Sequence, residues 1–363
     1  MAEASRVMEF HGTGRPLELR RYPLPHLADG EVLVRVTCST LCGSDVHTYE
    51  GRRSTPLPTV LGHEILGRVA ALPAGSAVCD HEGTPLEIGD RITWSVAASC
   101  GSCFFCRDGL PQKCERLFKY GHEPISERHP LSGGLADYCH LAPGTAICRV
   151  PSELSDAVAC PANCATATVA AAIRYAGPCA GRVVLIQGAG MLGLTAAAMA
   201  GSGGAREVIV CDTVAERLRR AGRFGATRTA RVDDDGAALR AAVEQTTSGR
   251  GVDVALDLSG APAAMEAGIE LLRIGGRYVW VGAVFPVRPL AVSAETIVRK
   301  ILSIQGVHNY APEDLRRALE FLGRSHAQYP FEELVAETFA LEDAGAAFLH
   351  ASRSGALRVA VRA

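Results

Sequence analysis

A chain of 363 residues exceeds the size at which a single hydrophobic core stops growing, so two domains are expected. Hydrophobic residues make up 48% of the chain and charged residues 21%, a composition typical of globular proteins and not of disordered or fibrous ones. The formal net charge of -2 offers no basic surface for nucleic acid and no polybasic segment for a membrane, so neither partner is expected.

The first ten residues include Glu3, Arg6 and Glu9 and contain no apolar run of signal-peptide length, which predicts a cytoplasmic protein. Because the cytoplasm keeps thiols reduced, the 13 cysteines are expected to act as metal ligands or as small buried apolar side chains. The buried apolar group is expected to comprise Cys38, Cys79, Cys139, Cys148, Cys160, Cys179 and Cys211.

Up to about residue 165, short apolar and β-branched runs such as Glu31–Thr37 alternate with glycine, proline and aspartate. This pattern predicts a mainly β first domain.

Two short segments of the first domain contain zinc-ligand residue types. Cys42–His47 reads Cys-Gly-Ser-Asp-Val-His, and Gly62–Glu64 reads Gly-His-Glu about twenty residues later. A catalytic zinc takes three protein ligands and keeps one position open for an alcohol, and Cys42 and His63 fit this need. A His–Glu pair alone is more often a core or solvated feature, so the flanking residues carry the assignment.

Four cysteines follow within fifteen residues. Two-residue gaps let successive thiolates turn toward one centre, and a Cys₄ set closes a tetrahedral structural zinc site. An iron–sulfur cluster is less favoured, because the last gap is too long for the bacterial pattern and no proline follows the last cysteine. Four unrelated buried thiols would be an unusual coincidence at this spacing. The predicted structural zinc ligands are Cys100, Cys103, Cys106 and Cys114.

From residue 166 the pattern changes to alternating strands and helices, which predicts a parallel sheet. An Ala-rich helix is expected near Thr166–Ala172, and a helix at Pro312–Leu322 follows the alternating region. The predicted strands are Val183–Gln187, Glu207–Cys211, Val252–Leu258 and Arg277–Val281, and the helices between them follow Gly190 or cover Glu216–Phe224 and Ala263–Leu272.

A glycine-rich loop joins the first of these strands to its helix. The motif comprises Gly188, Gly190, Met191, Leu192 and Gly193, with Ala189 after the first glycine. Such glycines permit a tight turn and close approach of a dinucleotide pyrophosphate, and the helix N-terminus favours the negative phosphates. Asp212 ends the next strand at the distance expected for a carboxylate that binds the adenosine ribose, which predicts NAD. Arg217, one helical turn away, keeps NADP open.

In this order the motifs resemble the zinc-containing medium-chain alcohol dehydrogenase family over nearly the whole chain. The resemblance implies a GroES-like catalytic domain over residues 1–165 and 307–363, and a doubly wound Rossmann domain that binds NAD over residues 166–306. It implies two zinc ions per chain, one catalytic and one structural, and hydride transfer from a small alcohol to NAD, giving an aldehyde or ketone. Relatives are dimers or tetramers, so a homodimer or homotetramer is expected.

The resemblance also implies roles for single residues of the metal site. The third catalytic zinc ligand would be Cys164, with Cys160 as the rival, and Cys164 is favoured because Thr168 then falls where the family places a threonine against the nicotinamide. Asp45 and Glu64 would orient the ligands without binding the metal.

A proton route and further cofactor contacts follow from the same resemblance. The alcohol proton would pass to Ser44, through the nicotinamide ribose to His47 and then to solvent, although Ser44 as a plain helix cap stays open. Arg217 would lie beside the ribose and Arg358 toward the pyrophosphate. Gly43 stands where some relatives carry a basic residue, so one phosphate contact is expected to be missing.

The substrate is less determined by motifs than the reaction. Arg52 and Arg53 follow a segment that borders the substrate channel in relatives and suit an anionic group, although a solvated surface pair is the alternative. Val96 is a further expected substrate contact. The sequences of Lys119–His122 and Pro161–Cys164 resemble those of a clade associated with phosphonate catabolism, so a hydroxyalkyl phosphonate is one substrate hypothesis. A polyol, threonine or a terpene alcohol is another.

Two other classes of protein remain as rivals. A non-catalytic, zinc-stabilised binding module predicts a broken catalytic site, and a zinc-free quinone or enoyl reductase predicts the loss of the metal cysteines. Metal content separates these classes from the dehydrogenase.

Overall fold

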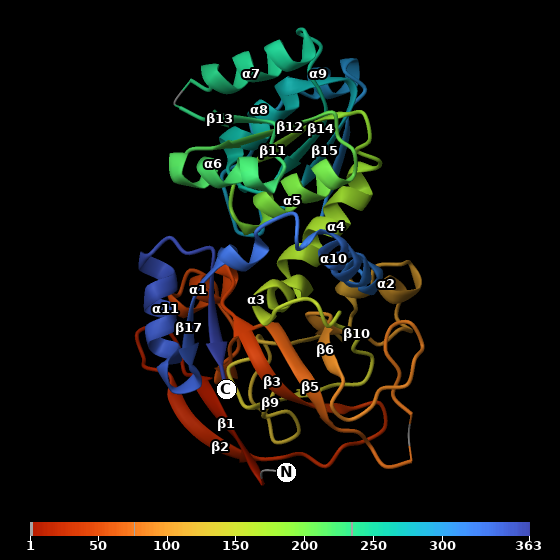
Figure 1. Cartoon of the computed structure of the whole chain (residues 1–363), viewed down its shortest axis with the longest axis vertical. Helices are drawn as coiled ribbons and strands as arrows, with labels where there is room; N and C mark the ends of the chain where they lie inside the picture. The colour runs from red at the N-terminus through yellow and green to blue at the C-terminus, as the bar shows by residue number, and fades with distance from the viewer. Residues whose placement is uncertain (1–2, 76, 234) are drawn as a thin grey trace. The chain divides into compact units, whose positions relative to one another are not determined.

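The computed structural model describes residues 3–75, 77–233 and 235–363, which form two compact units (Figure 1). Unit 1 comprises Met1–Cys164, Ala311–His326 and Phe331–Ala363, and unit 2 comprises Ala165–Tyr310 and Ala327–Pro330. The sequence prediction placed the return to the first unit at residue 307 and did not include the short excursion at Ala327–Pro330.

That excursion has a packing reason. The ring of Tyr329 stacks on Phe224 with the centroids 6.4 Å apart, and its hydroxyl lies 3.1 Å from the Ser202 Oγ. A large aromatic side chain therefore attaches these four residues to unit 2.

Unit 1 is built on a mostly antiparallel sheet with the order β10-β6-β5-β3-β18-β17, in which β9 also pairs with β3. Smaller sheets have the orders β2-β1-β4 and β7-β8. The strands are β1 (Ala4–Phe10), β2 (Glu18–Pro23), β3 (Val32–Thr40), β4 (Thr59–Val60), β5 (Glu64–Ala71), β6 (Arg91–Trp94), β7 (Ala97–Ala98), β8 (Phe118–Lys119), β9 (Tyr138–Leu141), β10 (Ile147–Arg149), β17 (Val335–Ala340) and β18 (Arg358–Arg362).

Short helices join and cover these strands. The helices of unit 1 are α1 (Gly43–Tyr49), α2 (Phe104–Arg107), α3 (Asp156–Ala159), α10 (Pro312–Ser325) and α11 (Ala344–Arg353), with 3₁₀ turns η1 (Pro111–Lys113), η2 (Cys160–Asn163), η4 (Phe331–Leu334) and η5 (Leu341–Asp343).

Strand β3 lies between the two cores of unit 1. Val34 belongs to the cluster that contains Trp94 and Tyr120, whereas Leu33 belongs to the cluster that contains Phe348. Successive side chains of a strand point to opposite faces, so covering both faces requires a continuous apolar run. Cys42 comes shortly after this strand, and His63 comes directly before its partner β5, so both residues are attached to the same sheet.

Unit 2 is a parallel sheet with the order β13-β12-β11-β14-β15-β16, and helices lie on it in the doubly wound arrangement. Its strands are β11 (Val183–Gln187), β12 (Glu207–Asp212), β13 (Arg228–Arg231), β14 (Val252–Asp257), β15 (Leu272–Trp280) and β16 (Ser303–Gly306). Its helices are α4 (Ala165–Ala176), α5 (Met191–Ser202), α6 (Ala215–Ala221), α7 (Ala237–Thr247), α8 (Pro262–Leu271) and α9 (Ala294–Arg299), with the 3₁₀ turn η3 (Gly222–Phe224).

Most of the predicted elements of unit 2 are confirmed to within a few residues, and β11 has the predicted bounds. The prediction missed β13 and β16 and began β15 too late. Strand β15 starts at Leu272, which pairs with Val252, and the register then shifts so that Arg277 pairs with Val254. This irregularity contains Gly275 and Gly276, which the sequence pattern did not favour as strand residues.

Within the described residues, no single helix is long and apolar enough to cross a membrane. One bent pair, Asp156–Asn163 with Ala165–Ala176, passes the same test by length and composition.

Candidate active site and metal centres

Three ligand-type side chains converge in unit 1 from separate segments. Cys42 precedes α1, His63 precedes β5, and Cys164 follows η2. Their ligand atoms, together with a carboxylate oxygen of Glu64, all lie within 4.8 Å of one another, and the His63 Nε2 lies 3.3 Å from the Cys164 Sγ. Two ligands bound at tetrahedral zinc are about 3.3–3.8 Å apart, so two sulfur atoms and one nitrogen at this spacing fit zinc.

Asp45 fixes the orientation of this ligand set. The His63 Nδ1 donates to the Asp45 Oδ1 over 3.0 Å, which leaves Nε2 directed to the ligand cluster. The same carboxylate accepts the backbone N–H groups of Gly62 at 3.3 Å and Cys42 at 3.0 Å. Asp45 is 1% exposed and His63 is 3% exposed. A buried carboxylate that holds a metal-binding histidine is the arrangement that sets its tautomer.

The Cys42 thiol is poised to be a thiolate. A hydrogen bond with the Cys164 thiol, and then the Arg358 guanidinium, hold the pKa of Cys42 well below its usual value although burial opposes them. The thiolate is the form that binds zinc.

Glu64 lies beside the ligands but its oxygens are bound by protein groups. The Arg358 Nε and Nη2 donate to the two oxygens over 2.7 and 2.8 Å, and the Thr40 Oγ1 donates over 2.6 Å. The Arg358 Nη2 also lies 3.4 Å from the Cys42 Sγ. This arrangement suits the predicted orienting role of Glu64. The guanidinium of Arg358 therefore has a partner inside unit 1, and its contact with a pyrophosphate stays a prediction.

The structure separates the two rival cysteines. Cys160 is buried, and its Sγ donates to the carbonyl oxygens of Cys38 at 3.3 Å and Glu64 at 3.4 Å, outside the ligand cluster. Asn163, which the sequence prediction missed, donates its Nδ2 to the carbonyls of His63 at 3.1 Å and Trp94 at 3.0 Å. The amide therefore attaches the turn before Cys164 to the His63 segment.

The four predicted structural ligands also converge within 4.8 Å. The Sγ of Cys103 lies 3.5 Å from that of Cys106 and 3.9 Å from that of Cys114. The backbone N–H of Ser102, followed by the Arg116 guanidinium, lowers the pKa of Cys100 to about 5. Four closely packed cysteine sulfur atoms fit a closed zinc site.

All 13 cysteines are free thiols, and one differs from its predicted environment. Cys79 is exposed and not buried, because it lies in the loop segment after β5, where its backbone makes only an isolated bridge with Pro85.

Helix α1 contains both members of the predicted proton route. The residue before the helix is Cys42, so Ser44 lies inside α1 and the plain-cap alternative is wrong. His47 lies in the last turn, where burial and then the charge of Arg52 lower its pKa. The imidazole is therefore neutral at physiological pH and able to accept a proton.

The two adjacent arginines point to different partners. Arg52 is 59% exposed and forms an ion pair with Glu50, whereas the Arg53 Nη1 lies 2.6 Å from the Nε2 of His122. Val96 is buried, and its carbonyl accepts the N–H of Tyr120 over 3.0 Å. Only Arg53 of the pair is directed to the interior of unit 1.

The glycine-rich loop of unit 2 joins β11 to α5. Gly188 has a φ of +99°, and a Cβ at Gly193 would lie 1.8 Å from the Gly188 carbonyl oxygen. The chain order changes direction between β11 and β14, and such a switch point is where doubly wound sheets bind ligands.

The Asp212 carboxylate binds the backbone of this loop and of the segment that follows β12. Its Oδ2 accepts the N–H of Ala189 over 2.7 Å, and its Oδ1 accepts the N–H of Val214 over 2.8 Å. The Nη1 of Arg217 lies 3.9 Å from Asp212 Oδ2.

Three further predicted cofactor contacts lie at helix starts of the same unit. Met191 is buried at the first turn of α5, whereas Leu192 and Thr168 are partly exposed. Their cofactor contacts stay predictions.

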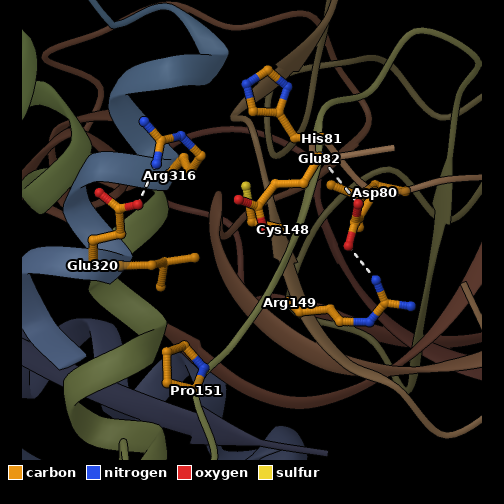
Figure 2. A pocket seen from close by; sticks show the side chains of 10 residues that line it. Asp80, His81, Glu82, Cys148, Arg149, Pro151, Arg316 and Glu320 are labelled. Carbon is orange, nitrogen blue, oxygen red and sulfur yellow. Dashed lines mark hydrogen bonds and ion pairs between the residues drawn. The ribbon is translucent and has the colours of Figure 1, made fainter. Parts of the chain in front are cut away.

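A small cavity of about 160 Å³ lies elsewhere in unit 1, between α10 and the segments around β10 (Figure 2). Two ion pairs lie in its lining, Arg149 with Asp80 and Arg316 with Glu320. Burial raises the pKa of the lining Cys148 to about 12, so this thiol stays protonated. The cavity therefore lies at the packing contact between α10 and the segments around β10.

Comparison with known proteins identifies the family. Residues 28–152 match the alcohol dehydrogenase GroES-like domain, and residues 192–324 match the zinc-binding dehydrogenase domain. The chain is 31% identical to 5-exo-hydroxycamphor dehydrogenase of Pseudomonas putida over 94% of both chains, and 35% identical to a probable alcohol dehydrogenase of Mycobacterium tuberculosis over 91% of this chain and 90% of the relative. A crystal structure of a Thermotoga maritima alcohol dehydrogenase matches with a TM-score of 0.92 at 30% identity, covering 99% of each chain.

The chain therefore belongs to the zinc-dependent medium-chain alcohol dehydrogenases. The predicted fold class, a GroES-like β domain with a Rossmann sheet, is confirmed. As a member of this family it is an oxidoreductase that acts on alcohols, which excludes the zinc-free reductase and the binding module as descriptions of its class.

The contact between Gly193 and Gly188 gives a stability prediction. In Gly193→Ala the new methyl group meets the Gly188 carbonyl, so the backbone must shift, and we expect a loss of about 1–3 kcal/mol. Gly190→Ala, which has open space at its Cβ, is the matched control. Thermal unfolding without cofactor measures both variants. Equal melting temperatures for the two variants would show that this close approach does not constrain the loop.

Proposed function

We propose that this chain oxidises a small alcohol to an aldehyde or ketone by hydride transfer to NAD, with a catalytic zinc held by Cys42, His63 and Cys164. The convergence of these three side chains within 4.8 Å carries the proposal. Because Glu64 is bound by Arg358 and Thr40, three protein ligands are free to bind the metal and a fourth position is left for the alcohol.

The protein groups orient the site and move the proton. Zinc, when bound, supplies a Lewis acid that lowers the pKa of the alcohol, and the nicotinamide supplies the hydride acceptor. Asp45 holds His63 through Nδ1, and Arg358 stabilises the Cys42 thiolate. The Ser44 hydroxyl would accept the alcohol proton as it gives up its own, and the neutral His47 imidazole, which stands later in the predicted route, would release a proton to solvent.

Metal analysis with Cys42→Ser tests the site. The wild type is expected to bind about two zinc ions per chain, and the variant about one, because only the Cys₄ lobe keeps its ligands. NAD-dependent oxidation should fall more than about 100-fold, since the loss of outer partners alone costs 10–100-fold. Cys160→Ala is the matched control and should keep both ions. Two ions in Cys42→Ser, or unchanged activity, would contradict the proposal.

We propose NAD as the preferred cofactor because Asp212, the last residue of β12, places its negative charge beside the glycine-rich segment. A 2′-phosphate would meet this charge. In Asp212→Asn the shape is kept and the repulsion removed, so the ratio of kcat/KM for NAD over that for NADP should fall about 10-fold. Steady-state kinetics with both cofactors measures it. The additional change Arg217→Gln should reduce the gain with NADP, and a wild type that prefers NADP would refute the assignment.

For the substrate we propose a small anionic alcohol such as a hydroxyalkyl phosphonate. The support is the resemblance of the Lys119–His122 and Pro161–Cys164 segments to the phosphonate-associated clade, together with the inward direction of Arg53. The camphor-alcohol relative favours a neutral terpene alcohol as the second candidate. The two candidates differ in charge.

We also propose a homodimer or homotetramer in the cytoplasm. Strand β16 ends the sheet of unit 2 in the described chain, and Val298 nearby is 74% exposed. A sheet edge and an exposed apolar side chain are suited to pairing with a second copy. The free thiols suit a reducing compartment.

Light scattering measures this assembly. The wild type should show at least twice the chain mass of 38.2 kDa, and Val298→Glu should shift the population toward monomer, because it places a charge in an apolar contact. Arg299→Gln, at the neighbouring exposed position, is the control. A monomeric wild type would exclude the proposal.

A further inference from the structure

We infer that Lys119, Arg53 and His122 form an anion-recognition subsite beside the zinc ligands, which binds the negatively charged oxygen group of the alcohol substrate. The inference rests on the proposed function, because it names the part of the same site that selects the substrate.

The imidazole of His122 is fixed as a hydrogen-bond acceptor toward Arg53. Its Nδ1 lies 2.9 Å from the Tyr120 carbonyl oxygen and must donate to it. Nε2 is then unprotonated and accepts from the Arg53 Nη1 over 2.6 Å. The histidine therefore positions the guanidinium without adding a charge.

His122 lies directly against His63, one of the predicted zinc ligands. The rings of His122 and His63 have centroids 5.3 Å apart. Gly121, with a φ of +75°, has no room for a side chain, because a Cβ there would lie 2.9 Å from the Gly62 carbonyl and 3.1 Å from the His63 Cβ. The turn after β8 and the turn before β5 are therefore in backbone contact, which fixes the turn of Lys119 and His122 relative to His63.

Neither cation of the subsite has a carboxylate partner in the described residues. Arg53 has only its imidazole contact, and the Lys119 ammonium makes no hydrogen bond or ion pair there. The nearby Glu123 binds the backbone N–H of Lys119 over 2.7 Å. The neighbouring Arg52, in contrast, is paired with Glu50.

Partial burial makes these unpaired charges costly. Lys119 is partly buried, and burial, followed by the charge of Arg53, lowers its pKa. The backbone N–H of His122 donates to the Lys119 carbonyl oxygen over 3.1 Å, so Lys119 belongs to the turn that lies against His63. A partly buried cation pair without acids is stabilised by a bound anion, and guanidinium with ammonium matches a phosphonate, phosphate or carboxylate.

Binding of methylphosphonate to the zinc-loaded protein tests the subsite directly. Isothermal titration should give a dissociation constant that rises about 10-fold or more in Lys119→Gln and in Arg53→Gln, because each loses a charged contact. Lys119→Arg should retain binding. Arg52→Gln is the matched control and should stay within about 2-fold of the wild type. Equal binding by all variants, or no binding by the wild type, would overturn the inference.

Turnover separates substrate charge from general catalysis. The ratio of kcat/KM for 2-hydroxyethylphosphonate over that for 1-propanol should fall at least about 10-fold in Lys119→Gln, mainly through KM for the phosphonate. The ratio should be unchanged in Arg52→Gln. With 3-hydroxypropanoate in place of the phosphonate, the same loss would assign the subsite to oxyanions in general, and a loss confined to the phosphonate would assign it to that group.

The failure of this inference differs from the failure of the proposed function. Zinc-dependent oxidation of 1-propanol with a ratio unaffected by Lys119→Gln and Arg53→Gln would refute the subsite alone. Activity that survives Cys42→Ser would refute the proposed function, whereas loss of methylphosphonate binding in Lys119→Gln would still support the subsite.

Discussion

The carboxylate of Asp45 is the interaction on which the metal site of unit 1 depends. It receives N–H groups from Cys42, Gly62 and His63, and so attaches the start of α1 to the turn before β5. These segments come from different parts of the sheet, and neither could place a ligand atom alone. Because the carboxylate is buried, each N–H that it accepts offsets part of the cost of removing its charge from water. One residue therefore sets the spacing of two ligands and the tautomer of one of them.

An ion pair between Arg358 and Glu64 connects the C-terminal strand to the metal site. Arg358 in β18 binds Glu64 at the start of β5, although 294 positions separate them. The pair leaves Glu64 unavailable as a fourth ligand and keeps a positive group next to the Cys42 sulfur. A buried arginine–glutamate pair is a poor source of stability, because desolvation offsets its attraction. Its position indicates that it serves the charge balance of the metal site.

The sequence predicts metal chemistry well because ligand chemistry restricts both residue type and spacing. Cys100 to Cys114 and the glycine loop are local patterns. The bounds of β11 are predictable for the same reason, because a glycine lies close to each end of its apolar run. Directions of side chains are harder to predict, since Arg52 and Arg53 are alike in sequence and differ only in how the turn after α1 aims them. Cys160 and Cys164 present the same difficulty, because η2 turns one thiol into the core and the other toward His63. Lys119 and His122 stand out in the sequence only as part of a segment similar to one clade, because their relation to His63 depends on a long-range backbone contact that no periodicity encodes.

The contact between Gly121 and Gly62 has a consequence for selectivity. Two turns that touch through backbone alone cannot be moved apart by a change of rotamer, so the distance between the turn of Lys119 and the turn of His63 is fixed by main-chain geometry. An alcohol then satisfies both ends only if its carbon chain has the matching length. In such a protein, selection among homologous substrates would follow chain length more steeply than the identity of the charged group, and new length preferences would arise by remodelling these two turns and not by exchanging the side chains that they display.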